Sequence, residues 1–249
     1  MPRYLEEVRT TVPFHEWDDF LLDMRNLNGH PWKQGQHVAL IGKTGCGKTT
    51  LANAILPIRH NTVVIATKPV SPSLEKFGKE NGYARIETWD PKANPATMPK
   101  RILWPPVSNF AHVPRQRYVI GMAFNDIYGV GKWCIYVDEL RFITDTLKLN
   151  DAVELFLQQG RELGISFIGG MQRPKFVPLL VYSQSSHLFF WQEKDVNNLE
   201  RISAINSVDS RFIARVVTQL EEHEFLYIHS PTGYMCRSMA PNPDGREAK

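Results

Sequence analysis

The sequence predicts an α/β fold in which a mainly parallel central sheet is covered by helices on both faces. The first observation is a short apolar stretch, His37–Ile41, which has the length and apolarity of a strand buried on both faces. It runs directly into a glycine-rich turn and then into a helical pattern. The second observation is that further apolar stretches of strand length alternate with segments of helical periodicity, which is typical of a parallel sheet with crossover helices.

The elements are expected in the following order along the chain. Apolar residues at helical spacing predict an amphipathic helix at residues 14–27 that packs on the core. After the glycine-rich turn, helices are expected around residues 118–127 and 152–157, the second of them ending near Gly164. The expected strands are 62–67, 101–104, 133–137, 165–170, 188–191 and 224–229. Ligands of such sheets bind at the carboxyl ends of the strands, and each chemical motif below falls at such an end.

The glycine-rich turn is the most informative stretch of the chain. Residues 42–49 fit the pattern G-x-x-x-x-G-K-[ST], whose backbone N–H groups form a nest for phosphate at the start of a helix. Lys48 is expected to reach the β- and γ-phosphates, and the Thr49 hydroxyl to hold Mg²⁺. A chance match in a glycine-rich turn is the alternative. The predicted cofactors are ATP and Mg²⁺, and the predicted contacts with ATP are Gly42, Lys43, Thr44, Gly45, Cys46, Gly47, Lys48, Thr49 and Thr50.

A second motif, WCIYVDELRF, places an acidic pair directly after a buried strand. Asp138 is expected to hold the Mg²⁺ shell, and Glu139 to polarise the attacking water as a general base or orienting group. The alternative is an acidic pair that opens an ordinary loop. A carboxylate beside the metal carboxylate favours hydrolysis over phosphorylation of a small molecule.

The third motif, GRELGISFIGGMQRP at residues 160–174, resembles the FtsK–HerA superfamily of DNA-pumping ATPases. The resemblance covers roughly residues 37–230 and implies a RecA-like P-loop NTPase fold. It implies that Gln172 is a sensor that contacts the γ-phosphate and the attacking water. It further implies that Arg161 is a finger inserted into the site of a neighbouring subunit. The alternatives are that Gln172 caps the next helix and that Arg161 pairs with Glu162 or Glu154.

Within this superfamily, the size and layout of the chain are most similar to virus genome-packaging ATPases. The resemblance therefore implies a DNA translocase that forms a hexameric ring, acts on DNA, chiefly duplex, and has a virus capsid as a partner. A conjugation or segregation motor is the alternative within this class. A nucleotide-dependent kinase or switch without nucleic acid is the alternative outside it. The DNA contacts cannot be assigned from the sequence, because the basic residues that could line a DNA channel are scattered along the chain. These basic residues are Lys43, Arg141, Arg173, Lys175 and Arg201.

Length and composition set the remaining expectations. The 249 residues suffice for one large domain, and the net charge of +3 permits a nucleic-acid partner without requiring one. We expect a helical lead-in at 1–30, an ATPase domain at 31–240 and a flexible tail at 241–249. Three distant cysteines without metal spacing, and the lack of a membrane-span or signal pattern, favour a cytoplasmic protein. A viral origin would place it in the host cytoplasm and the virion.

Overall fold

The computed structural model describes residues 6–26, 29–90, 98–203 and 210–241. They group into two units. The first unit contains the residues up to Lys33, His37–Ile55 and the chain from Gly170 onward. The second unit contains Gln34–Gln36 and Leu56–Gly169.

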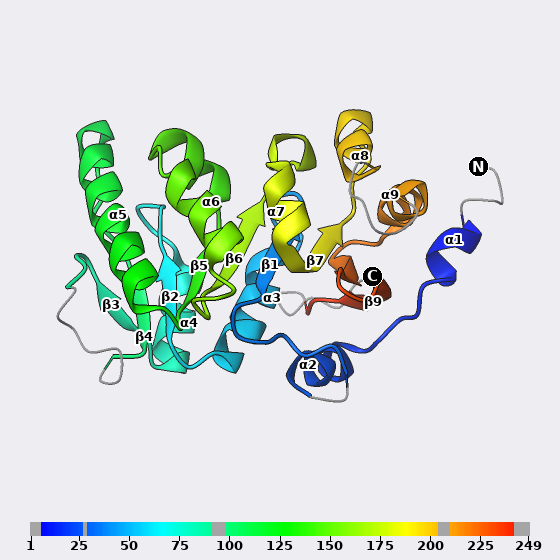
Figure 1. Ribbon diagram of the computed structural model, residues 1–249. Coiled ribbons are helices and arrows are strands. Elements are labelled where there is room, and N and C mark those ends of the chain that lie inside the picture. The colour runs from blue at the N-terminus through cyan, green and yellow to red at the C-terminus, as the bar shows by residue number, and fades with distance from the viewer. Residues whose placement is uncertain (1–5, 27–28, 91–97, 204–209, 242–249) are drawn as a thin grey trace. The chain divides into compact units, whose positions relative to one another are not determined.

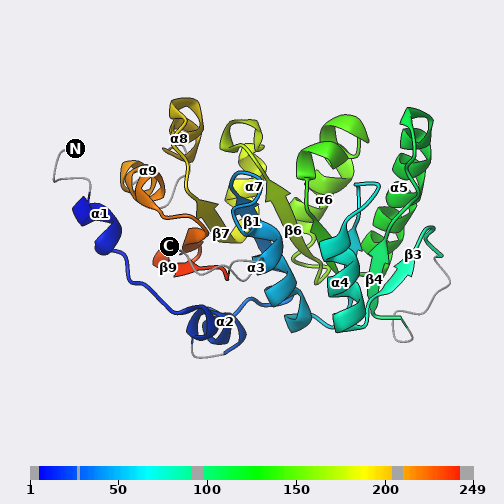
Figure 2. The ribbon, with the colours of Figure 1, turned by 180° about the vertical axis from the view of Figure 1, so that it is seen from behind.

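The second unit is built on parallel strands that pair in the order β3-β4-β2-β5-β6. Helix α4 (Pro72–Asn81) covers one face of these strands, and α5 (Val113–Val130) and α6 (Asn150–Gln159) cover the other (Figures 1 and 2). The last residues of β6, Gly170 and Met171, belong to the first unit. The strands are β2 (Thr62–Ile65), β3 (Ala84–Ile86), β4 (Lys100–Leu103), β5 (Cys134–Val137) and β6 (Ser166–Met171). Single-turn segments are η2 (Leu56–Ile58), η3 (Phe110–His112) and the π-helical η4 (Phe142–Thr146).

In the first unit, β1 (His37–Ile41) pairs in parallel with β7 (Ser185–Trp191). The antiparallel strands β8 (Glu224–His229) and β9 (Tyr234–Met239) follow on the far side of β7. Helix α3 (Lys48–Ile55) lies on one face of these strands and α7 (Leu179–Gln184) on the other (Figures 1 and 2). The remaining helices are α1 (Glu6–Thr10), α2 (Trp17–Arg25), η5 (Pro174–Phe176), α8 (Val196–Ser203) and α9 (Ser210–Gln219).

A buried ion pair fastens the last two strands of the first unit. The Glu224 side chain is fully buried on β8 and pairs with Arg237 of β9. The other Glu224 carboxylate oxygen lies 3.1 Å from Nε of Arg9 in α1. Because removing one partner would leave a buried charge uncompensated, this pair fixes β9 and the N-terminal helix on the same sheet edge.

The predicted fold class is confirmed: the sheet is mainly parallel, with helices on both faces of the strands in each unit. The predicted helix at 14–27 corresponds to α2, in which Phe20 and Met24 are buried, while Leu27 lies outside the described residues. The strands β3 and β9 and the helices α1, α4, α7, α8 and α9 were not predicted from the sequence. The domain bounds at residues 30 and 240 stay a prediction, and residues 242–249 of the expected tail lie outside the described part of the chain.

Candidate nucleotide-binding site

The phosphate loop of the first unit connects β1 to α3, as the sequence predicts, and close packing shapes it. Gly47 has φ of 110°, a conformation that residues with a side chain rarely adopt. A Cβ at Gly42 would lie 2.7 Å from the Cβ of Trp191 and 2.8 Å from Sγ of Cys46. The loop therefore needs glycine at Gly47 for its backbone conformation and at Gly42 for the close approach of β7.

Lys48 is folded onto the backbone of its own loop. The side chain is buried, and its Nζ donates hydrogen bonds to the carbonyl oxygens of Gly42 at 2.6 Å and Lys43 at 2.8 Å. Thr49 and Thr50 are half-buried in the first turn of α3, at the positive end of the helix dipole. The loop thus holds a fixed cation, backbone N–H groups and two hydroxyl groups beside a helix amino end, which is a set of groups that suits a polyphosphate.

Two side chains, Trp191 and Cys46, pack closely at the phosphate loop. Trp191 is buried at the end of β7, and its Nε1 lies 3.5 Å from the position that a Cβ of Gly47 would take. Cys46 is buried within the loop, and burial raises the pKa of its thiol, although nearby Lys48 opposes this shift. Cys46 therefore packs within the loop, and the sequence placed Trp191 at the end of an expected strand but not in the site.

Gln172 lies next to the phosphate loop in the same unit. The backbone N–H of Gly42 donates a hydrogen bond of 3.0 Å to the carbonyl oxygen of Met171, the last residue of β6. Gln172 follows directly and is exposed. The cap position of η5 is occupied by Arg173, so Gln172 does not stand where the capping alternative required it.

The acidic pair of the second unit follows β5. The Asp138 Oδ1 accepts a hydrogen bond of 3.0 Å from the hydroxyl of Tyr136, and its Oδ2 lies 2.9 Å from Nζ of Lys68. Lys68 follows β2, the strand that pairs with β5, so both side chains come to the same edge of the sheet. Glu139 is half-buried beside Asp138. Carboxylate and hydroxyl oxygens are hard donors, so Asp138 of this unit and Thr49 of the first unit are of the chemical kind that suits Mg²⁺.

Arg161 lies at the opposite edge of the second unit, so the expectation that every motif falls at the carboxyl ends of the strands is wrong for this residue. It follows α6 and precedes β6, whereas Asp138 follows β5, and these two strands are parallel. Its backbone lies against Gly35, where a Cβ would come within 2.8 Å of the Arg161 carbonyl oxygen. The side chain is exposed, and the ion pairs among the described residues include none of Arg161 with Glu162 or Glu154. Within its own chain Arg161 is therefore separated from the acidic pair.

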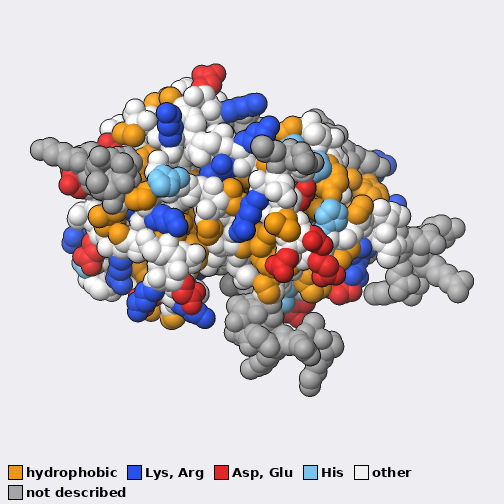
Figure 3. Space-filling model, turned by 90° about the horizontal axis from the view of Figure 1, so that it is seen from below, with side chains coloured by type: hydrophobic (Ala, Val, Ile, Leu, Met, Phe, Trp, Pro, Cys, Tyr) orange, Lys and Arg blue, Asp and Glu red, His pale blue; other side chains and the backbone are white. Residues whose placement is uncertain are grey.

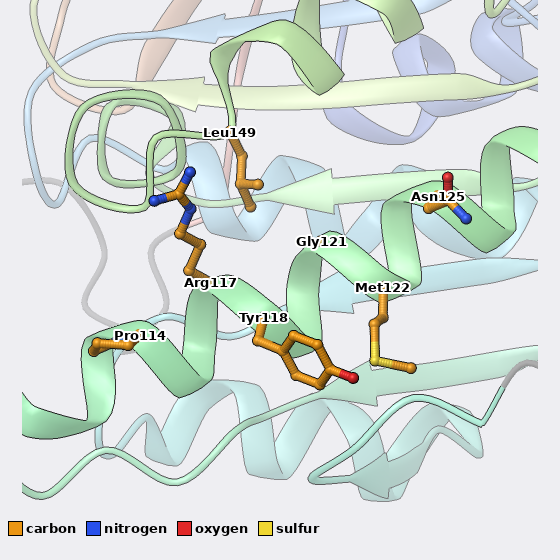
Figure 4. Close-up of a pocket in the computed structure, with 7 residues that line it drawn as sticks. All are labelled: Pro114, Arg117, Tyr118, Gly121, Met122, Asn125 and Leu149. Atoms are coloured by element: carbon orange, nitrogen blue, oxygen red, sulfur yellow. The ribbon is translucent and has the colours of Figure 1, made fainter.

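A hollow on the outer side of α5 is unrelated to these motifs. Its volume is about 480 Å³, and it contains none of the predicted site residues. Residues of α5 and Leu149, which precedes α6, line it (Figure 4).

A phosphate loop between a parallel strand and a helix, in a sheet of this kind, defines a P-loop NTPase with a RecA-like fold. The family model described as "ABC transporter" matches residues 28–172, which is more than half of the chain, and the chain therefore belongs to this family of P-loop ATPases. The described helices are all too short or too polar to span a membrane. No curated protein matches the sequence.

Solved structures agree with this classification. The genome packaging NTPase B204 from Sulfolobus turreted icosahedral virus 2, in complex with AMPPCP, is similar with a TM-score of 0.60 and 16% identity, over 81% of this chain and 96% of that one. The conjugation coupling protein TcpA of pCW3 is similar over 83% of this chain and 60% of that one, with a TM-score of 0.51 and 13% identity. The Type VII secretion ATPase EccC of Thermomonospora curvata is similar over 87% and 26%, with a TM-score of 0.53 and 13% identity. At these identities the likeness to the solved structures shows the fold alone.

Proposed function

We propose that this chain is an ATP-hydrolysing DNA translocase of the FtsK–HerA type that powers the packaging of a viral genome. The observation that carries the proposal is the position of Gln172 directly after Met171, whose carbonyl oxygen accepts a hydrogen bond from Gly42, the first residue of the phosphate loop. A neutral amide at that position can contact both a γ-phosphate and an attacking water. The similarity to a packaging NTPase over nearly the whole length of that protein supports the same reading.

The site residues divide the chemistry of hydrolysis among them. Lys48 and the loop N–H groups bind the β- and γ-phosphates, and Glu139 polarises the attacking water. Thr49 and Asp138 would hold Mg²⁺, which when bound neutralises charge on the phosphate oxygens. Gln172 orients the water and reports the presence of the γ-phosphate.

Arg161 acts in the site of a neighbouring subunit in this proposal. Its place at the amino end of β6, away from Asp138 of its own unit, supports a role in trans. A finger of this kind contributes about 10³–10⁵ in rate when it reaches the γ-phosphoryl oxygens. A closed ring supplies every site with one such finger, and we propose a hexamer.

The proposed partners are duplex DNA and a virus capsid, and the proposed locations are the host cytoplasm and the virion. A conjugation or segregation motor is the second candidate, favoured by the likeness to a conjugation coupling protein. A kinase or switch without nucleic acid is a weaker candidate, because the acidic pair after β5 favours attack by water.

The decisive experiment is ATP hydrolysis measured with and without long duplex DNA. DNA should raise the turnover of the assembled protein, and the effect should fade as salt increases, because phosphate contacts release counterions. Turnover that DNA leaves unchanged at low salt, in protein shown by light scattering to be assembled, would favour the candidate without nucleic acid.

A further inference from the structure

Two buried side-chain nitrogens next to the phosphate loop have no hydrogen-bond partner among the described residues. They are Nε1 of Trp191, the last residue of β7, and Nδ1 of His223, which directly precedes β8. Both atoms are shielded from solvent, and Trp191 is only 1% exposed. A buried polar atom without a partner destabilises a fold, so its presence calls for an explanation.

Both nitrogens converge on Gly47 of the phosphate loop. A Cβ on Gly47 would lie 3.5 Å from Nε1 of Trp191 and 3.9 Å from Nδ1 of His223. It would also lie 3.1 Å from the Cβ of Ala240, which directly follows β9. Three segments of the first unit, far apart in the sequence, therefore meet at one residue of the loop.

The turn before β8 holds His223 against the loop. The φ of His223 is 63°, in the left-handed region that residues with a side chain seldom adopt. The turn is closed by the N–H of Glu224, which donates a hydrogen bond of 3.2 Å to the carbonyl oxygen of Glu221. A residue kept in a less favoured conformation beside a ligand site is a candidate for a functional role.

The place of Gly47 in the loop indicates which part of a nucleotide these groups would meet. Gly47 directly precedes Lys48, which we expect to bind the β- and γ-phosphates. A nucleotide held there must extend its nucleoside half past the loop. An indole N–H, an imidazole nitrogen and the apolar Ala240 suit a nucleoside, since small-molecule sites combine apolar surface with a few convergent polar groups.

Other features of the described structure give no comparable indication of a nucleoside site. On the face shown in Figure 3, Lys and Arg side chains are spread among apolar and acidic groups. The hollow on α5 lies in the second unit and contains no residue of the phosphate loop. The unpartnered nitrogens, in contrast, directly adjoin the loop.

Ala240 covers this region. It is 1% exposed, and its N–H donates a hydrogen bond of 3.1 Å to the carbonyl oxygen of His223. The next residue, Pro241, has no N–H to add a second bond. Because the two nitrogens are shielded from solvent, a ligand reaches them only when a covering group shifts. Ala240 is the covering group nearest to Gly47.

We propose that Trp191 and His223 bind the nucleoside half of ATP, and that Ala240 moves away from Gly47 when the nucleotide binds. The inference rests on the proposed function, since it concerns the same nucleotide site. The indole Nε1 donates a hydrogen bond to the nucleoside, and Nδ1 of His223 makes a second one. The two residues thereby favour a nucleotide over a bare polyphosphate, which would leave their polar atoms unpaired.

The first test compares a non-hydrolysable ATP analogue with inorganic tripolyphosphate, each measured by competition against a fluorescent nucleotide. Trp191→Phe keeps an aromatic ring and loses only the N–H. It should bind the analogue about fivefold more weakly and tripolyphosphate within about twofold of the parent. The matched control is Trp89→Phe, which loses an indole N–H bonded to Asp126 in the second unit. It should bind both ligands within about twofold of the parent.

A pair of substitutions tests His223 in the same assay. His223→Ala should weaken the analogue about fivefold and leave tripolyphosphate within about twofold. His223→Asn should keep most of the affinity for the analogue, because asparagine tolerates the left-handed conformation and retains a polar side chain. Melting temperatures check that both variants fold. If His223→Ala weakens the two ligands equally, the residue only supports the loop and its proposed role is overturned.

The outcomes separate this inference from the proposed function. If the parent binds no ATP analogue, both fail. If the parent binds the analogue no more tightly than tripolyphosphate, or if Trp191→Phe affects the two ligands equally, only the inference is overturned. A selective loss of analogue affinity in Trp191→Phe supports the inference even if DNA leaves ATP hydrolysis unchanged, in which case the proposed function alone fails.

The second test follows the movement of Ala240 by amide hydrogen exchange in nuclear magnetic resonance. The ATP analogue should speed exchange of the Ala240 amide at least about threefold, because its hydrogen bond to His223 opens. Tripolyphosphate should not have this effect, and the amide of Cys236 within β9 should be unchanged by either ligand. Unchanged or slower exchange at Ala240 with the analogue bound would overturn the proposed movement.

Discussion

The phosphate loop of the first unit and the acidic pair of the second hold their charges in different ways. Lys48 is 7% exposed and is bonded to backbone carbonyls of its own loop. The Asp138 side chain is 31% exposed and is paired with Lys68, which comes from another strand. The loop is therefore organised by its own backbone, whereas the carboxylate depends on side chains that the sheet brings together. Changes in the loop should affect the binding of nucleotide, and changes around the carboxylate should affect turnover and the metal requirement.

The largest effect is expected from Lys48→Ala. Removal of this buried cation should weaken ATP binding by about 10³-fold, since the loss of a buried charge partner costs about 3–5 kcal/mol. Titration with a fluorescent ATP analogue measures the affinity, and Lys79→Ala serves as the control for the loss of an exposed lysine. Parental affinity in Lys48→Ala would show that the loop does not bind the phosphates.

Arg161→Ala should affect turnover and leave binding unchanged. The variant should bind ATP with parental affinity and hydrolyse it about 10³-fold more slowly, because the γ-phosphoryl oxygens lose a donor. Glu139→Gln subunits, which carry an intact Arg161, should restore part of the activity when mixed in. If mixing restores nothing although light scattering shows mixed assemblies, Arg161 does not act in trans. Arg115→Ala on α5 is the control for removal of an exposed arginine.

Glu139→Gln should separate binding from hydrolysis within the acidic pair. The amide has the size of the carboxylate but cannot accept the proton of water, so turnover should fall at least ~10²-fold while ATP stays bound. Parallel measurement of steady-state hydrolysis and analogue binding tests this. Hydrolysis at the parental rate would remove Glu139 from the catalytic role.

The smallest effect is expected from Lys68→Met. Loss of the cation beside Asp138 should lower the Mg²⁺ concentration that half-saturates analogue binding, by up to about fivefold, because an exposed ion pair contributes about 0–1 kcal/mol. Lys79→Met controls for the loss of an exposed charge. We expect Lys68 to compete with Mg²⁺ for the Asp138 carboxylate. A higher Mg²⁺ requirement in Lys68→Met would contradict this and show that Lys68 supports the metal site.

The comparison also explains which features were predictable from the sequence. The phosphate loop and the acidic pair were predictable because each lies in a contiguous stretch at the end of an apolar strand. Lys68 was not, because only the pairing of β2 with β5 brings it to Asp138. Strand β9 was not predicted, because it buries Arg237 and Ser238 and so lacks the apolar pattern of a buried strand. The ion pair with Glu224 compensates the charge of Arg237.

The buried connections around the phosphate loop were unpredictable for the same reason. Trp191 has ordinary surroundings in the sequence, and its role depends on how β7 packs in the first unit. Arg161 was predicted as a trans-acting finger from a resemblance alone. Its position at the amino end of β6 is compatible with that role, which stays a prediction until the mixing experiment is done.

The most direct test of the central claim is displacement of a triplex-forming oligonucleotide from long duplex DNA. A motor that moves along duplex DNA removes the third strand as it passes, whereas a protein that only binds DNA does not. The account predicts ATP-dependent displacement by the parent protein and none by Glu139→Gln, although this variant should bind both ATP and DNA. DNA-stimulated hydrolysis without any displacement would contradict the claim that the chain is a translocase.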